Sequence, residues 1–306
     1  MISRISLKAA AKVNLYLEIT GNRPDNYHEL VMILQSIDLC DRVDIRKIGT
    51  DEIQITCSNP EVPCDRTNLA YKAAALLKKS FPDVGGMEIS IDKQIPMGAG
   101  LAGGSADAAA VLVGIDRLWD LGLTKSELCD FAAQLGSDIP FCISGGTALA
   151  TGRGEILSPL PDLTDLFLVI CKPRQIAIST VWAYQTFRSQ NLLATSQVKD
   201  QNLSSQIVTA IASGGEAAAV KIGRLLYNDL ERVVLPEYPA IAELKQKLLD
   251  QECLGAMMSG SGSTVFAIAS DLERAEIIAE FIKQDPNSSA IDVWVVKSLV
   301  RSIFDA

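Results

Sequence analysis

Hydrophobic and polar residues alternate along residues 2–20, and this pattern predicts a half-buried β-strand. A cluster of turn-forming residues at 21–26 follows it and is expected to reverse the chain. One face of the predicted strand is apolar and the other is polar. The apolar positions are Val13, Leu15, Leu17 and Ile19, and the polar positions are Lys12, Asn14, Tyr16 and Glu18.

The same kind of pattern predicts the remaining elements. One or two strands are expected over 31–48, and single strands over 52–57, 87–95, 166–171, 264–269 and 291–297. Helices are expected over 68–80, 105–119, 124–135, 179–189, 204–213, 216–232, 239–251 and 271–283, with a further one starting near Asp138. Residues 190–203 are polar without periodicity, so a mobile loop is expected there.

A proline-containing segment at 158–162 marks the expected domain boundary. The elements before and after it predict an α+β protein of two domains. A sheet-rich N-terminal domain would span residues 1–160, and a smaller α/β domain would span residues 161–306. Ligand pockets form preferentially between domains, so the site is expected in the cleft that the second domain closes.

The segment from Pro96 to Gly104 carries the strongest chemical signal, because it holds four glycines and leads into an alanine-rich stretch. Glycines let backbone N–H groups approach an anion closely, and a helix start adds further donors. Ser105 is expected to cap this helix or to turn its hydroxyl toward a phosphate or metal ion. The predicted phosphate loop is Pro96, Met97, Gly98, Ala99, Gly100, Leu101, Ala102, Gly103 and Gly104.

Several known phosphate loops do not fit this segment. The glycines at 98, 100 and 103 match the dinucleotide-binding fingerprint, but that fold needs a strand where residues 124–135 predict a helix. A Walker A loop needs a lysine after its glycines, and protein kinases need His-Arg-Asp and Asp-Phe-Gly, none of which occurs. A plain turn without a ligand remains the alternative, which the density of glycines disfavours.

Composition narrows the function further. The net charge of −9 disfavours a nucleic-acid surface, and the seven cysteines without a Cys-x-x-Cys pair suit a reducing cytosol. No apolar run has membrane-spanning length, and the N-terminus lacks a signal-peptide pattern. His28 is the single histidine, which excludes a metal site built from several histidines.

Four other segments are candidates for chemistry, although each has a structural alternative. Lys12 and Asn14 lie on the same face of the predicted strand. The structural alternative is that this face is simply exposed to solvent. Tyr27 and His28 follow a turn, where a histidine is more often structural. Residues 136–141 (Gly-Ser-Asp-Ile-Pro-Phe) could simply cap a helix through Ser137 or Asp138. Residues 258–263 (Met-Ser-Gly-Ser-Gly-Ser) are either a second anion-binding turn or a flexible connector.

Taken in this order, the segments resemble the GHMP small-molecule kinases, which include galactokinase and the homoserine, mevalonate and phosphomevalonate kinases. The Lys-x-Asn and Tyr-His pairs resemble the subfamily whose alcohol substrate carries a cytidine diphosphate. The resemblance implies a ribosomal-protein-S5-domain-2-like N-terminal domain and a ferredoxin-like C-terminal domain. It covers nearly the whole chain, at residues 11–15, 26–30, 96–109, 136–141, 177–184, 228–231 and 258–266.

The resemblance also implies a reaction, in which ATP phosphorylates the 2-hydroxyl of a cytidine-diphosphate-linked methylerythritol on the non-mevalonate isoprenoid pathway. In that case Asp138 is the catalytic base and Lys12 its neighbour. The phosphate loop from Pro96 to Ser105 binds ATP, with Asn68 near the adenine. Mg²⁺ is held by the ATP phosphates, with Ser105 as the candidate protein ligand. The implied substrate-binding residues are Asn14, Tyr27, His28, Thr180 and Tyr184.

These implications predict a small-molecule partner, with no nucleic-acid or membrane partner, and a monomer or weak homodimer. The expected location is the cytoplasm, or a plastid if the chain is a processed form. Three alternatives stay open: another GHMP kinase, a binding protein that has lost catalysis, and a nucleic-acid module of similar N-terminal architecture. The Tyr27–His28 pair disfavours another GHMP kinase, and the Lys12–Asp138 pair disfavours a binding protein without catalysis. The acidic net charge disfavours a nucleic-acid module.

Overall fold

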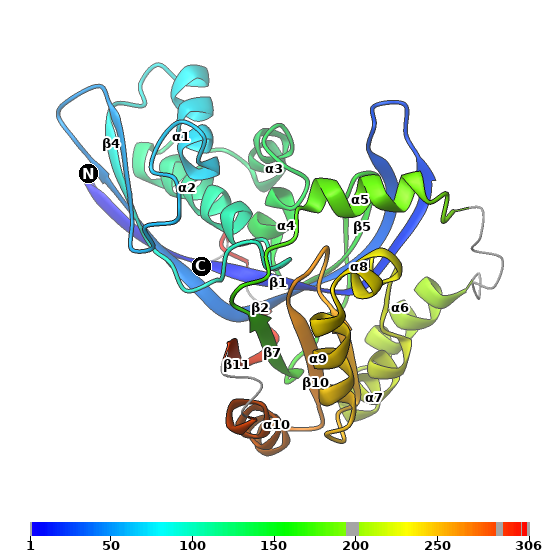
Figure 1. Cartoon of the computed structure of the whole chain (residues 1–306). Helices are drawn as coiled ribbons and strands as arrows, with labels where there is room; N and C mark the ends of the chain where they lie inside the picture. Colours follow the sequence, from blue (N-terminus) through cyan, green and yellow to red (C-terminus); the bar gives the residue numbers. More distant parts are fainter. Residues whose placement is uncertain (1, 194–201, 286–289, 301, 305–306) are drawn as a thin grey trace.

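Two β-sheets organise the chain in the computed structural model, which describes residues 2–193, 202–285, 290–300 and 302–304 (Figure 1). The first sheet has the strand order β3-β4-β2-β1-β8, with β5 paired to β2 and β6 paired to β5. Its strands are β1 (Arg4–Asn22), β2 (His28–Lys47), β3 (Ile53–Cys57), β4 (Met87–Asp92), β5 (Thr147–Thr151), β6 (Ile156–Pro159) and β8 (Tyr227–Asn228). The helices of this half are α1 (Leu69–Ser80), α2 (Gly103–Trp119), α3 (Lys125–Ala133) and α4 (Ile139–Ser144).

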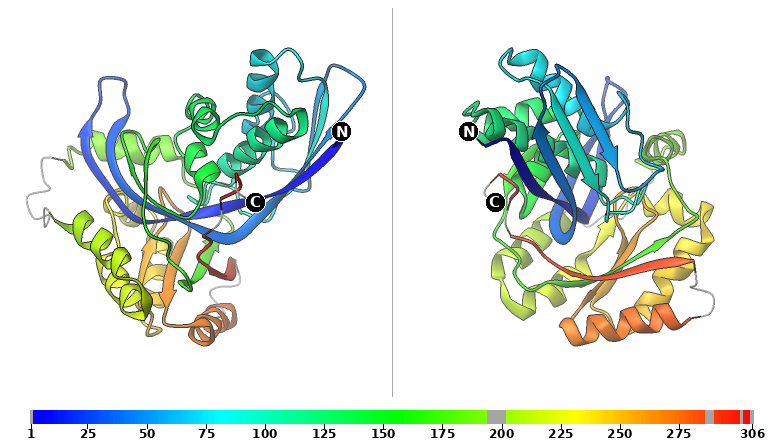
Figure 2. Two further views of the ribbon diagram at one scale, coloured as in Figure 1. Left: turned by 180° about the vertical axis from the view of Figure 1, so that it is seen from behind. Right: turned by 90° about the vertical axis from the view of Figure 1, so that its left-hand side faces the viewer.

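The second sheet is antiparallel and has the order β11-β7-β10-β9. Its strands are β7 (Phe167–Pro173), β9 (Gly255–Met258), β10 (Val265–Ala269) and β11 (Ile291–Lys297). The helices of this half are α5 (Thr180–Ser189), α6 (Leu203–Ser213), α7 (Gly215–Leu225), α8 (Glu231–Glu237), α9 (Pro239–Leu249) and α10 (Leu272–Gln284). Figures 1 and 2 show the long β1–β2 pair running between the helices α1–α4 and this second sheet.

The middle of β1 is buried on both faces, so the predicted half-buried strand is wrong there. Every residue from Ala11 to Leu17 is buried. Val13 packs in a core with residues of α2, while Leu17 belongs to a second core with residues of β7 and β10. The polar residues between them are covered too, because the second half of the chain folds against this strand.

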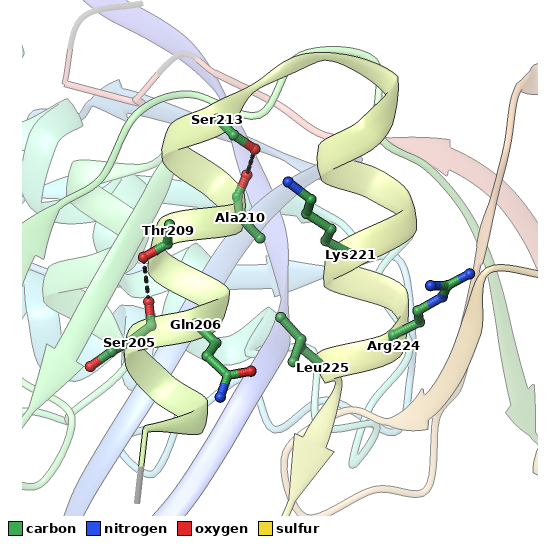
Figure 3. Close-up of a pocket in the computed structure, with 8 residues that line it drawn as sticks. All are labelled: Ser205, Gln206, Thr209, Ala210, Ser213, Lys221, Arg224 and Leu225. Carbon is green, nitrogen blue, oxygen red and sulfur yellow. Dashed lines mark hydrogen bonds between the residues drawn. The ribbon is translucent and has the colours of Figure 1, made fainter. Parts of the chain in front are cut away.

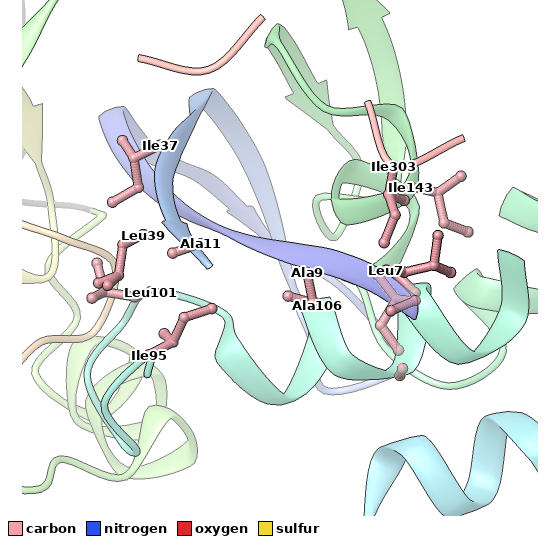
Figure 4. Close-up of a cluster of buried hydrophobic side chains, with 14 of the residues drawn as sticks. Leu7, Ala9, Ala11, Ile37, Leu39, Ile95, Leu101, Ala106, Ile143 and Ile303 are labelled. Atoms are coloured by element: carbon pink, nitrogen blue, oxygen red, sulfur yellow. The ribbon is translucent and has the colours of Figure 1, made fainter. Parts of the chain in front are cut away.

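Small side chains allow α2 to approach the sheet closely. Figure 4 shows Ala106 of α2 beside Ala9 of β1 in the first core. A Cβ on Gly114 would lie 2.5 Å from Cδ1 of Ile45 in β2. The alanine-rich sequence of α2 is therefore a packing requirement of the helix that follows the glycine loop.

Most of the predicted elements are confirmed, and the departures have local causes. The segment 31–48 is one strand, β2, and the hairpin of β5 and β6 was not predicted. The single helix expected over 216–232 is wrong, because β8 interrupts it to pair in parallel with β1. The mobile loop expected over 190–203 falls mainly on 194–201, which lie outside the described residues.

The role of Ser105 as a helix cap is also wrong. α2 begins at Gly103, and its N-cap is Ala102 in the left-handed region with φ 59°. Ser105 therefore lies in the first turn of the helix rather than before it. The described part of the chain contains no helix with the length and apolar character needed to cross a membrane.

Candidate active site

The glycine loop lies between β4 and α2 with its backbone open to a ligand. Gly98 and Gly100 have φ of +56° and +72°, a region that side chains disfavour. No side chain caps the start of α2. The N–H groups of the first helical turn are therefore available to an anion, which the positive end of the helix dipole also favours.

A close contact with a distant turn fixes the middle of this loop. The backbone N–H of Lys12 donates to the carbonyl of Leu101 at 3.1 Å, which ties the loop to β1. The hydroxyl of Ser259 donates to the carbonyl of Gly100 at 3.0 Å. A Cβ on Gly100 would lie 2.1 Å from the carbonyl oxygen of Ser259, so no larger residue fits without a shift.

A buried ion cluster, which no motif in the sequence marks, holds both ends of the loop. Lys93 Nζ lies 2.5 Å from Asp41 Oδ2 and 2.6 Å from Asp107 Oδ2. The other oxygen of Asp41 accepts the backbone N–H groups of Gln94 and Ile95, which lead into the loop. Burial raises the pKa of Asp107 to about 7, although the charge of Lys93 opposes this. The cluster therefore joins β2, the residues that follow β4, and the first turns of α2.

The predicted pair of Lys12 and Asp138 is brought together. Lys12 Nζ lies 3.9 Å from Asp138 Oδ2 and 2.6 Å from Asn14 Oδ1. The register of β1 against β2 shifts on both sides of residues 12–14, and such bulges often re-aim side chains beside active sites. Asp138 stands at the N-cap position of α4, but its side chain makes no capping bond. Capping therefore does not explain Asp138.

The serine-rich turn at residues 259–263 packs against the same two β1 residues. The hydroxyl of Ser259 accepts the backbone N–H of Asn14 at 3.3 Å. A Cβ on Gly260 would lie 3.5 Å from Lys12 Nζ. The hydroxyls of Thr180 and Ser261 are 2.9 Å apart, which brings the start of α5 to the turn. The turn is buried throughout, so a flexible connector does not describe it.

His28 packs against two aromatic rings, those of Tyr184 and Phe187. Its ring centroid is 5.3 Å from that of Tyr184, and it meets the ring of Phe187 edge-on at 6.4 Å. Its Nε2 is buried and has no hydrogen-bond partner. Burial, and then the charge of Arg188, lower the pKa of His28. The imidazole is therefore neutral near pH 7 with one polar atom unpaired, and Phe187 joins the residues that the sequence suggested.

Tyr184 and Tyr27 take different places around His28. Burial raises the pKa of Tyr184, and the charges of Asp138 and Asp229 raise it further. Tyr27 is 53% exposed, and the guanidinium of Arg153 lies 4.9 Å from its ring centroid. The structure thus offers one partly buried and one exposed aromatic ring on this side of the site.

Asn68 already has structural partners. Its Oδ1 accepts the backbone N–H of Ala70 at 2.8 Å, which caps α1, and its amide donates to the carbonyl of Pro63 at 2.7 Å. The start of α1 still lies near the loop, because a Cβ on Gly104 would lie 3.8 Å from Leu69. A contact between Asn68 and the adenine remains a prediction.

A separate pocket of about 470 Å³ lies between α6 and α7 (Figure 3). It contains none of the residues predicted to carry chemistry, so it is not the site described above. The described residues also include no group of three His, Cys, Asp or Glu side chains that could bind a metal. The pocket is lined by Ser205, Gln206, Thr209, Ala210, Ser213, Lys221, Arg224 and Leu225.

Comparison with known families and structures identifies the class of protein. Residues 68–146 match the family model described as "GHMP kinases N terminal domain", and residues 216–287 match "GHMP kinases C terminal". The fold and the glycine loop are thus those of a GHMP kinase. A homoserine kinase structure from Cytophaga hutchinsonii, with 21% identity and a TM-score of 0.72 over 98% of this chain and 96% of its own, shares this fold.

More similar relatives define the family within that class. "4-diphosphocytidyl-2-C-methyl-D-erythritol kinase" from Nostoc punctiforme is 49% identical over 97% of each chain. The protein of that name from Gloeobacter violaceus is 50% identical over 96% of this chain and 94% of its own. A crystal structure of 4-(cytidine 5'-diphospho)-2C-methyl-D-erythritol kinase, 31% identical, matches with a TM-score of 0.77 over 96% of this chain and 99% of its own. The chain belongs to the 4-diphosphocytidyl-2-C-methyl-D-erythritol kinase family.

Proposed function

We propose that the chain transfers the γ-phosphate of ATP to the 2-hydroxyl of 4-diphosphocytidyl-2-C-methyl-D-erythritol, giving the 2-phosphate and ADP in the methylerythritol phosphate pathway. The observation that carries this proposal is the convergence of three features. The open glycine loop suits the phosphates of ATP, the Lys12–Asp138 pair suits transfer to an alcohol, and His28 suits a nucleobase.

The glycine loop and the start of α2 would hold the ATP phosphates through backbone N–H groups. Ser105 in the first turn of α2 is the proposed protein contact for Mg²⁺, which would neutralise phosphate charge when bound. The phosphates themselves would supply most of the other ligands of Mg²⁺.

The Lys12–Asp138 pair would act on the hydroxyl. We infer that Asp138 accepts its proton as the oxygen begins to bond to phosphorus. Lys12 would then stabilise the developing negative charge, in an orientation fixed by its hydrogen bond to Asn14. Phosphoryl transfer depends mainly on positioning and charge neutralisation, so a weak carboxylate base suffices.

His28 and its aromatic neighbours would recognise the cytosine. A neutral imidazole has one donor and one acceptor, and the cytosine edge presents both kinds of partner. The unpaired Nε2 of His28 is the atom proposed to contact the base. Tyr184 and Tyr27 would lie beside the cytosine ring, and Thr180 would lie near the polar part of the substrate.

Other features of the proposal follow from composition. The net charge of −9 supports a small-molecule partner over nucleic acid, and we infer a monomer or weak homodimer. The seven cysteines are free thiols, which suits a cytoplasmic location. The proposed domain division places residues 1–160 and 161–306 on the two sides of the cleft.

A substrate panel tests the proposal. Purified protein is incubated with Mg·ATP and, separately, the cytidine substrate, its free methylerythritol phosphate precursor, homoserine and mevalonate, and ³¹P NMR locates any new phosphate. We expect a 2-phosphate on the cytidine substrate alone. Transfer to homoserine or mevalonate instead would reject the role of His28, and no transfer to any compound would reject the kinase reaction.

A further inference from the structure

Asn228, at the end of β8, binds the serine-rich turn with both of its amide protons. Its Nδ2 donates to the carbonyls of Met258 and Gly260, each at 2.8 Å. Its Oδ1 accepts the backbone N–H of Leu230 at 2.9 Å. The side chain is buried, and both of its amide hydrogens and its amide oxygen have hydrogen-bond partners.

The residues around Asn228 fix its own position. Asp229 donates its backbone N–H to the carbonyl of Leu17 at 2.9 Å, and its carboxylate accepts the N–H of Ile19 at 2.8 Å. Both bonds attach β8 to β1. Glu231 accepts the backbone N–H of Met258 at 2.9 Å. Residues 228–231 therefore connect the first sheet to the base of a turn that belongs to the second sheet.

We propose that Asn228 is a positioning residue for the kinase reaction, which it serves by holding the serine-rich turn against Lys12 and Asn14. The kinetic part of this inference rests on the proposed function. Asn228 touches neither of the proposed reacting groups directly. It acts through Ser259, whose hydroxyl contacts Asn14 and Gly100, and through Gly260, which lies against Lys12.

The chemistry of the site explains why an amide is needed at position 228. Two carbonyl oxygens face the side chain, so it must supply two donors, while the Leu230 N–H needs an acceptor. Among side chains of this size, only the Asn amide offers both. A carboxylate in the same place would face two carbonyls without a proton to share, and would move the turn away.

Asn228→Asp tests the inference, with Asn191→Asp as a matched control. Both substitutions turn an amide into a carboxylate, but Asn191 is exposed beyond the end of α5, whereas Asn228 is buried against the turn. Hydrogen exchange measured on a peptide covering residues 258–264 reports the turn itself. Steady-state kinetics with ATP and the cytidine substrate report its effect on catalysis.

We expect faster exchange in the turn and a fall in kcat of about 10- to 100-fold for Asn228→Asp, because displacement of the reacting groups costs rates of this order. The KM for the cytidine substrate should change less than kcat, since the His28 side of the substrate site is not touched. Asn191→Asp should leave exchange over residues 258–264 unchanged. Where Asn228→Asp does not fold, Ser259→Ala should reproduce the loss of kcat.

Two results would overturn the inference: unchanged exchange in the turn, or faster exchange with a normal kcat. Failure of the proposed function would give a different result from failure of the inference about Asn228. If the wild-type protein does not phosphorylate the cytidine substrate, that function is rejected. The exchange data then decide alone whether Asn228 positions the turn.

Discussion

The side chain of Lys12 carries an ammonium group although it is only 5% exposed to solvent. A charge in such a place needs polar partners, because burial removes its hydration. Asn14 supplies a hydrogen bond at 2.6 Å, and Asp138 supplies the opposite charge at 3.9 Å. The longer of these distances leaves the carboxylate of Asp138 free to approach a substrate hydroxyl.

Asp138→Asn should separate chemistry from binding. The amide keeps the shape of the side chain but is not a base, so we expect kcat to fall by about 10²–10⁴-fold with ATP affinity retained. Steady-state kinetics and calorimetric titration with ATP measure the two effects. Asp130→Asn, on an exposed position of α3, is the control. Turnover like that of the wild type would reject Asp138 as the base.

His28→Ala should affect the two substrates unequally. The imidazole packs against Tyr184 and Phe187, and its proposed ligand is the cytosine, so its loss should weaken binding of the cytidine substrate and not of ATP. We expect the KM for the cytidine substrate to rise by about 10-fold or more, as for a lost buried hydrogen bond, and the KM for ATP to change little. Equal rises in both KM values would mean that His28 is structural.

The protonation of His28 can be followed directly, since the chain has a single histidine. Burial and the charge of Arg188 both disfavour the imidazolium, so its pKa in the folded protein lies below the ordinary 6.5. The unfolded chain then binds more protons than the folded one below pH 6.5. The contribution of His28 to the free energy of unfolding is complete above this pH and falls as the pH drops through the window below it.

NMR of protein labelled with ¹⁵N-histidine measures that pKa from one set of imidazole signals. Urea denaturation at several pH values, compared between wild type and His28→Gln, measures the stability. We expect the difference between the two proteins to depend on pH only below about 6.5. A pKa at or above 6.5 would contradict the assignment of a buried neutral ring.

The order of short motifs along the sequence was enough to predict Lys12, Asn14 and Asp138, which the structure brings together. It did not find Lys93, and it gave no role to Asn228, although residues 228–231 carry part of the resemblance. The partners that define these two roles lie elsewhere in the chain, so no local pattern shows what either side chain does. A buried lysine looks like a surface lysine in sequence until the carboxylates that surround it are known.

At the scale of the elements, position 100 of the glycine loop requires a glycine for two separate reasons. Gly100 needs a positive φ and also close contact with the carbonyl of Ser259. Gly122 shares the first demand, with φ +70°, but has nothing within 4 Å of the place of a Cβ. These two glycines therefore allow the strain of the backbone to be measured apart from the steric contact.

Gly122→Ala should lower the free energy of unfolding by about 1–2 kcal/mol, the cost of a left-handed L-residue. Gly100→Ala should cost about 1–3 kcal/mol more, because the added methyl must displace the turn. Urea denaturation of both variants gives the comparison, and kcat/KM for ATP should fall only for Gly100→Ala. Equal losses of stability would show that the turn moves aside without cost.

The one mistaken helix shows the limit of local patterns. Residues 216–232 have a helical distribution of apolar side chains, and α7 and α8 use most of it. The break at Tyr227 and Asn228 comes from pairing with Tyr16 and Leu17, about two hundred positions away. Such tertiary pairing overrides local preference and leaves little trace in the segment itself.

At the scale of the whole molecule, both hydrophobic cores draw residues from both sheets. The first core contains Val13 of β1 and Phe266 of β10, and the second contains Leu34 of β2 and Val265 of β10. Neither core is therefore built from the residues of one sheet alone. We therefore expect the two halves to unfold together in one transition, even though the chain is long enough for two domains.

Tryptophan fluorescence distinguishes the two halves. Trp119 lies in α2 and Trp294 in β11, and each is partly buried against the first core. Variants that keep only one of these tryptophans, with phenylalanine at the other positions, should unfold at the same urea concentration. Midpoints that differ by more than the error of the measurement would mean that the sheets are separate folding units.

The contact of Ser259 with Gly100 spans 159 positions of the chain, and its contact with Asn14 spans 245. Synthesis proceeds from the N-terminus, so the glycine loop leaves the ribosome long before the turn that supports it. A nascent chain that stops before Ser259 carries the loop without that support. Assembly of the kinase site is thus tied to near-complete translation, and stalled or truncated products cannot form it.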